Sequence, residues 1–246
     1  MSTGFGVDVG GSGVKGAPVD LALGALAAER VRVPTPQPAT PDAVVDVVAE
    51  VLERAGAPEG RFGLTLPAVV TGGVARTAAN IDPAWVGTDV AALVRERTGR
   101  EAVVVNDADA AGLAEARYGA ARGVDGVVLV LTLGTGIGSA LVADGHLVPN
   151  TELGHLELDG ADAESRAADS AREREDLSWE EWAARLQRYL EHVDGLLWPD
   201  VVVLGGGVSK KAHKWLPLLE VRPELRVAAL RNDAGIVGAA LLAAGG

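Results

Sequence analysis

The chain has no cysteine, which excludes disulfide bonds and metal sites built from thiolates. It also lacks a membrane-spanning segment, because no apolar run approaches the roughly 20 residues that such a helix needs. The N-terminal sequence MSTGFGVDVGG shows neither the basic region nor the cleavage site of a secretory signal peptide. We therefore expect a cytoplasmic protein that makes no membrane contact.

Basic residues are scarce as well. Lys and Arg number 22 against 34 Asp and Glu, so that the formal net charge is −12. This balance argues against a broad nucleic-acid-binding surface, although it allows a polyanionic ligand if the few cations gather in one place. Aromatic residues make up only 4%, but 48% of the chain is hydrophobic. A chain of 246 residues can then fold as two lobes of roughly 120 residues each.

The stretch that organises the chain spans residues 131–157 and reads LTLGTGIGSALVADGHLVPNTELGHLE. The apolar run Val127–Leu133 predicts a buried strand, and residues 139–142 predict a return strand. Between them stand Gly134, Gly136 and Gly138, whose alternate spacing permits a tight turn with amides that converge on an anion. The same pattern also fits an ordinary glycine-rich hairpin.

Ionisable side chains follow this turn closely. Glu152, His155 and Glu157 lie within six positions of one another. A phosphate cradle followed by a polar, acid-rich cluster is what a phosphoryl-transfer enzyme with a hydroxylated substrate needs.

Another glycine turn lies near the N-terminus, between strands predicted at residues 5–9 and 14–19. Asp8 stands just before the turn and Lys15 just after it, so both side chains can face a ligand held over the turn amides. The segment is not a P-loop, because the Gly-Lys-Ser/Thr ending is missing, and no helix follows it as a dinucleotide-binding motif requires. A surface hairpin with unconnected charges is the alternative.

Two further predicted strands end in polar segments. Residues 201–204 end in a third glycine turn, Gly205-Gly206-Gly207, which leads toward a helix and the basic residues Lys210, Lys211 and Lys214. Residues 102–105 end in Asn106-Asp107 and run straight into a helix. A carboxylate at such a place either caps the helix or serves as a catalytic base. We expect capping from one of Asp107 and Asp109, and the preceding Asn106 favours a substrate-binding Asn-Asp pair for Asp107.

The remaining pattern alternates strands and helices. Strands are predicted at residues 30–33 and 62–66, and helices at 41–55, 90–97, 179–197 and 234–244. The third of these helices opens with a capping box at Ser178 and Glu181, and its apolar face is predicted to be core or subunit interface. The charge-rich residues 160–176 are predicted to form exposed helix and loop. Asn80 lies in a loop that is either a ligand contact or a plain connection.

Three glycine turns, each at the end of a predicted strand, together with the Asn-Asp strand end, resemble the sugar-kinase branch of the actin-like ATPase fold. Within that branch, Glu152-Leu153-Gly154-His155 is similar to the ROK family of hexokinases. Residues 131–157, 106–115 and 205–211 look like those of its actinobacterial polyphosphate glucokinases, and the resemblance covers essentially the whole chain. It implies a two-lobed α/β fold of the ribonuclease H-like type, with a small N-terminal lobe (1–106), a larger C-terminal lobe (107–233), and a last helix (234–246) that packs on the first lobe.

The resemblance also implies roles for single residues. Asp107 becomes the general base that takes the proton from the 6-hydroxyl of glucose as this oxygen attacks the terminal phosphoryl group. The residues that would bind the sugar are Asn80, Asn106, Asp107, Glu152, His155 and Glu164. Those that would bind phosphate are Asp8, Gly10, Gly11, Ser12, Lys15, Gly134, Thr135, Gly136 and Gly138. Those that would border the nucleotide or polyphosphate are Gly205, Gly206, Gly207, Lys210 and Lys211.

The implied co-substrate is inorganic polyphosphate, with ATP as an alternative, and Mg²⁺ would bridge the phosphate oxygens, with Asp8 nearby through water. Arg172, Arg174 and Lys214 are further candidates for the walls of a polyphosphate groove, although they fit ordinary solvated charges equally well. Many ROK members carry a Cys-rich zinc motif after the Gly-His pair. Because this chain has no cysteine, we expect no structural zinc, assign His155 to the substrate, and expect Glu164 to replace the acid that follows that motif.

The resemblance further implies a homodimer, and it leaves rival functions to weigh. The nearest is a strictly ATP-dependent ROK hexokinase that acts on glucose, mannose or an acylamino sugar. A sugar-responsive transcriptional regulator would need a DNA-binding segment ahead of the first strand, where only about four residues stand. A non-catalytic relative would be expected to lose the base, yet Asp107 is present.

Overall fold

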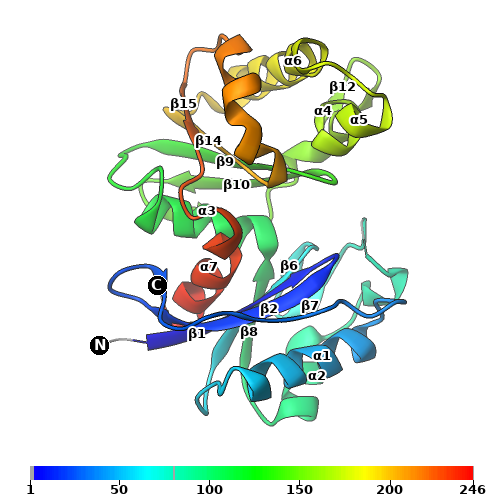
Figure 1. Cartoon of the computed structure of the whole chain (residues 1–246), viewed down its shortest axis with the longest axis vertical. Helices are drawn as coiled ribbons and strands as arrows, with labels where there is room; N and C mark the ends of the chain where they lie inside the picture. The colour runs from blue at the N-terminus through cyan, green and yellow to red at the C-terminus, as the bar shows by residue number, and fades with distance from the viewer. Residues whose placement is uncertain (1–2, 80, 246) are drawn as a thin grey trace. The chain divides into compact units, whose positions relative to one another are not determined.

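The computed structural model describes residues 3–79 and 81–245 (Figure 1). The chain folds into two compact units, Met1–Ala114 with Asp233–Gly246, and Glu115–Asn232. We call them the N-terminal and the C-terminal unit. The boundary falls inside helix α3 (Asp107–Tyr118), later than the predicted position 106, and it makes the N-terminal unit the longer one. Within the N-terminal unit, α3 packs against the C-terminal helix, since the carbonyl oxygen of Ala110 would lie 1.8 Å from a Cβ on Gly238.

A mixed sheet forms the centre of the N-terminal unit, with the strand order β3-β2-β1-β5-β8 and β4 paired to β2. Strands β1 and β2 form an antiparallel hairpin, whereas β1, β5 and β8 run parallel to one another. The carboxyl ends of these parallel strands therefore meet at one edge of the sheet. The strands are β1 (Thr3–Gly10), β2 (Gly13–Asp20), β3 (Ala25–Leu26), β4 (Val31–Val33), β5 (Phe62–Leu66) and β8 (Ala102–Asn106).

Helices cover both faces of this sheet. Helices α1 (Pro41–Arg54) and α2 (Val90–Thr98) lie on one face, and α7 (Ala234–Ala243) lies on the other (Figure 1). Helix α1 has its proline in the first turn and places its valines in the core, as the sequence pattern predicts. Buried side chains of β1 and β5 complete that core.

Helix α7 packs unusually close to the sheet because two strand residues opposite it are glycines. A Cβ on Gly6 of β1 would lie 2.0 Å from the carbonyl oxygen of Ile236, and one on Gly63 of β5 would lie 1.9 Å from that of Ala239. No side chain fits in such a space, so glycine is required at both positions. Through these contacts the end of the chain becomes part of the N-terminal unit.

The C-terminal unit has its own five-stranded sheet, in the order β11-β10-β9-β14-β15. Strands β9, β10 and β11 form an antiparallel meander, and β9, β14 and β15 run parallel. The carboxyl ends of β9 and β14 consequently lie side by side. The strands are β9 (Val127–Leu133), β10 (Ile137–Ala143), β11 (His146–Val148), β14 (Val201–Gly205) and β15 (Glu224–Val227).

The long helix α6 (Trp179–Leu197) packs its apolar face into the core of this unit, with Trp182 and Leu186 fully buried. The capping box of Ser178 and Glu181 is present as predicted. Because this face is internal, it is not available as a subunit interface. The prediction of an exposed segment at residues 160–176 is wrong in part: it contains α4 (Glu164–Ala167) and α5 (Asp169–Arg174), whose alanines are buried, and Trp182 Nε1 donates to the carbonyl of Ala167 at 3.0 Å.

A buried carboxylate anchors the end of α3 that belongs to this unit. Glu115 is 1% exposed, and it accepts backbone N–H groups from Ala120 at 2.8 Å, Ala229 at 3.0 Å and Leu230 at 2.7 Å. Three donors compensate the cost of removing a charge from water. Glu115 thereby ties α3 to the segment that follows β15.

Short elements complete the two units. The remaining strands are β6 (Val70–Thr71), β7 (Val74–Ala75), β12 (Glu157–Leu158) and β13 (Ala161–Asp162), and the 3₁₀ helices are η1 (Pro83–Trp85), η2 (Leu153–His155), η3 (Gly207–Lys214), η4 (Leu216–Leu218) and η5 (Arg231–Asp233). Among the described helices, none combines the length and the apolar character of a membrane span.

The contact between β5 and α7 makes a testable prediction about stability. Gly63→Ala should lower the free energy of unfolding by about 1–3 kcal/mol or more, because the added methyl group overlaps the backbone of Ala239. Gly195→Ala is the matched control: this glycine lies in α6 with no atom within 4 Å of an added Cβ, and alanine should be neutral or stabilise the helix by up to about 1 kcal/mol. Urea unfolding midpoints measure both, and equal midpoints would contradict the packing argument.

Candidate active site

The first glycine turn is a two-residue connection between β1 and β2. Gly10 and Gly13 are paired across the hairpin, which leaves Gly11 and Ser12 at its tip. The turn is fixed from outside, since Thr35 Oγ1 donates to the carbonyl of Gly10 at 2.5 Å and the Arg32 guanidinium donates to that of Ser12 at 2.6 Å.

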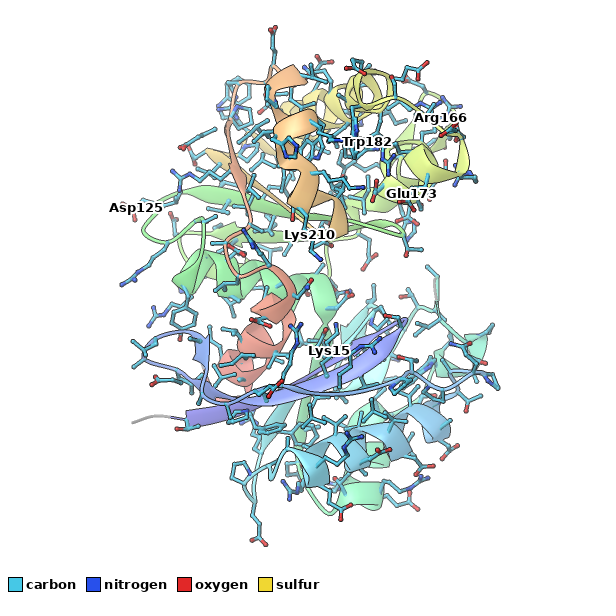
Figure 2. All side chains as sticks on the ribbon, in the orientation of Figure 1. Lys15, Asp125, Arg166, Glu173, Trp182 and Lys210 are labelled. Atoms are coloured by element: carbon cyan, nitrogen blue, oxygen red, sulfur yellow. The ribbon has the colours of Figure 1, made fainter. Side chains whose placement is uncertain are left out.

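Asp8 and Lys15 face each other across the hairpin. Lys15 Nζ lies 3.1 Å from Asp8 Oδ2, and Thr65 of β5 donates its hydroxyl to Asp8 Oδ1 at 2.9 Å. The side chain of Lys15 is 22% exposed and that of Asp8 is 17% exposed, so both remain within reach of a ligand. The alternative of a surface hairpin with unconnected charges is therefore wrong. Figure 2 labels Lys15 on this hairpin.

The donor set around Asp8 fits a magnesium ion that is reached through a water molecule. Both of its oxygens already accept a hydrogen bond, from Lys15 and from Thr65. A Cβ on Gly235, in the first turn of α7, would lie 2.8 Å from Asp8 Oδ1. Each oxygen keeps a second lone pair for a water, and Mg²⁺ commonly retains several waters in protein sites.

A cavity of about 260 Å³ opens beside the first glycine turn, within the N-terminal unit. It extends from the turn to the loop at residues 35–39 and to the residues around η1. Its lining comprises Val9, Gly10, Gly11, Thr35, Gln37, Pro38, Ala39, Val44, Leu66, Pro67, Ile81, Asp82 and Trp85. Asn80, a predicted sugar-binding residue of the same loop region, lies outside the described residues.

Asn106 and Asp107 stand at the same sheet edge, where β8 ends and α3 begins. The amide oxygen of Asn106 accepts the backbone N–H groups of Ala108 at 2.8 Å and Asp109 at 3.1 Å. Asn106 is thus the residue that caps α3, and the prediction that an aspartate does so is wrong, because the cap stands one residue earlier. Asp107 is left half-buried and accessible, with Oδ1 accepting the N–H of Ala108 at 2.8 Å.

The second and third glycine turns touch each other within the C-terminal unit. Gly206 has a φ of 82°, and an added Cβ would lie 2.2 Å from the carbonyl oxygen of Leu133 at the end of β9. Ser170 of α5 holds the second turn from another side, through its N–H to Gly134 O at 3.0 Å and its hydroxyl to Thr135 O at 2.6 Å. Gly138 lies in β10, paired with Thr132, so the turn itself ends at Gly136.

Next to the second turn, the structure brings together three predicted sugar-binding residues, Glu152, His155 and Glu164. His155 Nε2 lies 3.8 Å from Glu152 Oε2, and His155 Nδ1 lies 3.9 Å from Glu164 Oε1. A fourth residue, Asp162, has its Oδ2 at 2.9 Å from His155 Nδ1. Sequence reasoning missed Asp162 because it is one of several acids in a charge-rich stretch, and nothing in its spacing distinguishes it.

Hydrogen bonding, burial and nearby charges raise the pKa values of side chains in and beside this cluster. The pKa of His155 is raised, chiefly by the hydrogen bond to Asp162 and further by the negative charges of Glu164, Asp162 and Glu152, while partial burial acts in the opposite direction. The pKa of Glu152 is raised by burial and by the charge of Glu164. Burial of the Tyr189 hydroxyl, with the charge of Glu164 added, raises the pKa of this tyrosine as well.

Glu164 connects the cluster to the second glycine turn. Its Oε2 accepts the backbone N–H of Ile137 at 2.9 Å, and a Cβ on Gly136 would lie only 2.3 Å from the same oxygen. The carboxylate therefore needs a glycine at that position. The ligand atoms of His155, Asp162 and Glu164 also lie within 4.8 Å of one another, a spacing that suits a divalent cation, so the absence of zinc stays a prediction.

Basic side chains gather around an aromatic ring in the C-terminal unit. The guanidinium carbon of Arg172 lies 4.3 Å from the ring centroid of Trp179, and the ammonium nitrogens of Lys211 and Lys214 both lie 5.8 Å from it. Lys210, labelled in Figure 2, belongs to the 3₁₀ helix η3, which also contains Lys211 and Lys214. Arg174 contacts other groups, the carbonyl of Ser165 and the carboxylate of Glu175.

Comparison with known proteins gives this geometry a context. Residues 4–175 match the model of a family described as the ROK family. This chain belongs to the ROK family. It is 52% identical to the polyphosphate glucokinase of Mycobacterium tuberculosis strain CDC 1551 / Oshkosh over 239 residues, which are 97% of this chain and 90% of the relative.

Solved structures of sugar kinases also resemble this chain. The inorganic polyphosphate/ATP-glucomannokinase of Arthrobacter sp. strain KM is 53% identical, with a TM-score of 0.95 and 99% of both chains covered. A ROK family glucokinase of Streptomyces griseus, in complex with glucose and AMPPNP, is 24% identical with a TM-score of 0.84 and covers 100% of both chains; at that identity it shows the fold alone. The predicted α/β fold of the actin-like ATPase type, the ROK assignment and the resemblance to polyphosphate glucokinases are thereby confirmed.

The contact between Glu164 and the second turn can be tested at Gly136. Gly136→Ala should displace the Glu164 carboxylate from the N–H of Ile137, and should lower kcat/KM for phosphoryl transfer by about 10-fold or more, the size of one lost charge-assisted hydrogen bond. Gly134→Ala, in the same turn, meets no atom within 4 Å and should have a smaller effect. Equal losses of kcat/KM in the two variants would show that the contact with Glu164 is not the reason why position 136 needs a glycine.

Proposed function

We propose that the chain transfers the terminal phosphoryl group of inorganic polyphosphate, and also of ATP, to the 6-hydroxyl of glucose. The observation that carries this proposal is the match to a polyphosphate glucokinase at 52% identity over 97% of this chain. The structure supports it in detail, because the base, the glycine turns and the acid–histidine cluster each stand where a strand or short helix fixes them.

In the proposed reaction the 6-hydroxyl oxygen attacks the terminal phosphorus, the bond from phosphorus to the bridging oxygen breaks, and Asp107 takes the hydroxyl proton. A carboxylate suits this role because it is ionised near neutral pH and needs only hydrogen-bond reach. In the N-terminal unit, the amides of Gly10–Ser12 and the ammonium of Lys15 would stabilise negative charge on the phosphoryl group. Mg²⁺, when bound, would neutralise charge on the phosphate oxygens, with Asp8 holding one of its waters.

In the C-terminal unit, the acid–histidine cluster would recognise the sugar. Glu152 and Glu164 can accept hydrogen bonds from ring hydroxyls, and His155 Nε2 offers a further contact beside Glu152. A fixed set of acceptors discriminates against a hydroxyl in the wrong orientation, because an acceptor that the sugar covers is then left unpaired. The amides of the second and third turns would bind the phosphates of the donor.

The cations around Trp179 add support for polyphosphate as the donor. A chain of phosphates presents many negative charges along an extended path, which favours several adjacent cations over a single one. Lys211 and Lys214 provide two such cations beside the Trp179 ring. Arg172 lies over the same ring, where it is also paired with Asp169 and Glu173. Because the chain as a whole carries a net negative charge, a polyanion would be attracted to this local group of cations rather than to the surface in general.

The second candidate is a strictly ATP-dependent ROK hexokinase that acts on glucose, mannose or an acylamino sugar. The third glycine turn is compatible with it, since Gly205–Gly207 would border a nucleotide as well as a polyphosphate. The Arthrobacter structure carries the name glucomannokinase, so mannose is the first alternative acceptor to assay.

We also propose that the protein works in the cytoplasm as a homodimer and without zinc. The resemblance to sugar kinases and the absence of cysteine support these points. The dimer would use a surface other than the apolar face of α6, because that face is buried in its own unit.

The base is tested with Asp107→Asn. In an assay of glucose 6-phosphate formation with Mg²⁺, kcat should fall by about 10²- to 10⁴-fold with either donor, since the amide cannot accept the proton. Asp125→Asn is the matched control, because Asp125 is exposed in the loop before β9 and carries no proposed role (Figure 2). Activity of the Asp107 variant within threefold of the wild type would remove Asp107 from the mechanism.

The donor is tested with the double substitution Lys211→Ala and Lys214→Ala. The KM for polyphosphate should rise by about 3- to 30-fold, the size of two exposed charge contacts, while the KM for ATP changes little. The control removes two cations from exposed helix surfaces elsewhere, by Arg54→Ala and Arg95→Ala, and should affect neither donor. Equal rises for polyphosphate and ATP would show that these two lysines do not distinguish the donors, and a wild type that uses ATP but not polyphosphate would favour the strictly nucleotide-dependent alternative.

A further inference from the structure

One carboxylate in the C-terminal unit bonds to two of the proposed sugar-binding residues at once. Asp162 Oδ2 lies 2.9 Å from His155 Nδ1, and Asp162 Oδ1 accepts the backbone N–H of Glu164 at 3.1 Å. Neither contact involves an atom that would face the sugar in the proposed function. Asp162, whose own side chain is 44% exposed, therefore contacts these residues at atoms other than those assigned to the sugar.

The backbone holds Asp162 in place independently of its side chain. It belongs to β13, which pairs with β12 so that Asp162 faces Glu157. The hairpin turn has Asp159 at φ 52° and Gly160 at φ 75°. The carbonyl of Asp162 accepts the hydroxyl of Ser165 at 2.6 Å. A short side chain on a fixed backbone loses little conformational freedom when it positions a neighbour.

The contact to His155 determines which ring nitrogen is available. When Nδ1 carries the proton and donates it to the Asp162 carboxylate, the neutral ring presents Nε2 as an acceptor. Nε2 is also the nitrogen that lies 3.8 Å from Glu152 Oε2. Two acceptors then stand side by side, and two neighbouring hydroxyls of a sugar can donate one to each.

The contact to Glu164 extends the same network to the second glycine turn. Glu164 donates its N–H to Asp162 and accepts the N–H of Ile137 with Oε2 at 2.9 Å. Hydrogen bonds thus connect His155, Asp162, Glu164 and Ile137 in sequence. Within this unit, one hydrogen-bond network therefore connects the groups proposed to bind the sugar with the turn proposed to bind phosphate.

We propose that Asp162 is a positioning residue for glucose recognition, which fixes the Nδ1–H tautomer of His155 and the position of Glu164. This inference rests on the proposed function. It assigns a role to a residue that touches neither the sugar nor the phosphate.

The pH dependence follows from the groups that face His155, which are Asp162 from β13, Glu164 from α4 and Glu152 before η2. Below the raised pKa of His155 the ring is protonated on both nitrogens, and Nε2 no longer accepts a hydrogen bond. Glucose affinity should therefore fall as the pH drops through that pKa. The hydrogen bond to Asp162 is the largest cause that raises the pKa of His155, so its removal should shift the acid limb to lower pH.

The experiment compares the wild type with Asp162→Ala and Asp162→Asn. For the alanine variant, KM for glucose should rise by about 10- to 100-fold, the usual effect of losing a partner that orients a binding side chain, while the KM for the phosphoryl donor changes less than about threefold. Asparagine keeps one oxygen, which can accept only one of the two hydrogen bonds that Asp162 accepts with its two oxygens. It should therefore restore part of the affinity, but with the acid limb still shifted.

The matched control is Asp159→Asn, in the same hairpin. Asp159 pairs with Arg188 at 3.0 Å rather than with His155, and asparagine tolerates its positive φ. This variant should retain the wild-type KM and pH profile. A reading independent of activity comes from ¹⁵N NMR of the imidazole, which should report the Nδ1–H tautomer for His155 in the wild type and a tautomer mixture in Asp162→Ala.

Three results would overturn the inference. The first is an unchanged KM for glucose and an unchanged tautomer in both Asp162 variants, with an active wild type. The second is a stoichiometric divalent metal in the purified protein whose removal by a chelator mimics Asp162→Ala, because His155, Asp162 and Glu164 would then be metal ligands. The third is a wild type that neither phosphorylates nor binds glucose, which would overturn the proposed function as well; the NMR tautomer would distinguish this case by remaining dependent on Asp162.

Discussion

Parallel pairing between strands that are distant in the sequence is the constraint on which the proposed site depends. In the N-terminal unit, β1, β5 and β8 run parallel, and their carboxyl ends place the first glycine turn and Asp107 at the same sheet edge. In the C-terminal unit, β9 and β14 run parallel, and the second and third glycine turns meet at their ends. A polar loop can bind a ligand there because the strands beneath it are buried and rigid.

Glycine makes this arrangement possible in two different ways. At Gly6 and Gly63 it removes the side chains that would keep helix α7 away from the sheet, so the end of the chain completes the unit in which it began. At Gly136 it leaves room for the Glu164 carboxylate against the second turn. The first use concerns stability and the second concerns the site, although both look alike in the sequence.

Charge is concentrated in small groups, although the chain as a whole is acidic. Cations surround Trp179, and acids surround His155, both within the C-terminal unit. Each group has an organising centre, an aromatic ring in the first case and an imidazole in the second. In the proposed function the cations would face the phosphate donor and the acids the hydroxylated acceptor, which need opposite kinds of partner, in a chain without a metal-binding cysteine.

The sequence by itself determined the local elements. Strands β5 and β9 and helix α6 begin and end where the apolar pattern, the capping box and the glycines place them, because these signals act between residues a few positions apart. Only the tertiary structure decided which strands pair, that the apolar face of α6 is internal, that Asn106 rather than an aspartate caps α3, and that Asp162 contacts His155 Nδ1. Those outcomes depend on long-range packing and on which of several equivalent polar groups reaches a partner, and a local pattern contains neither.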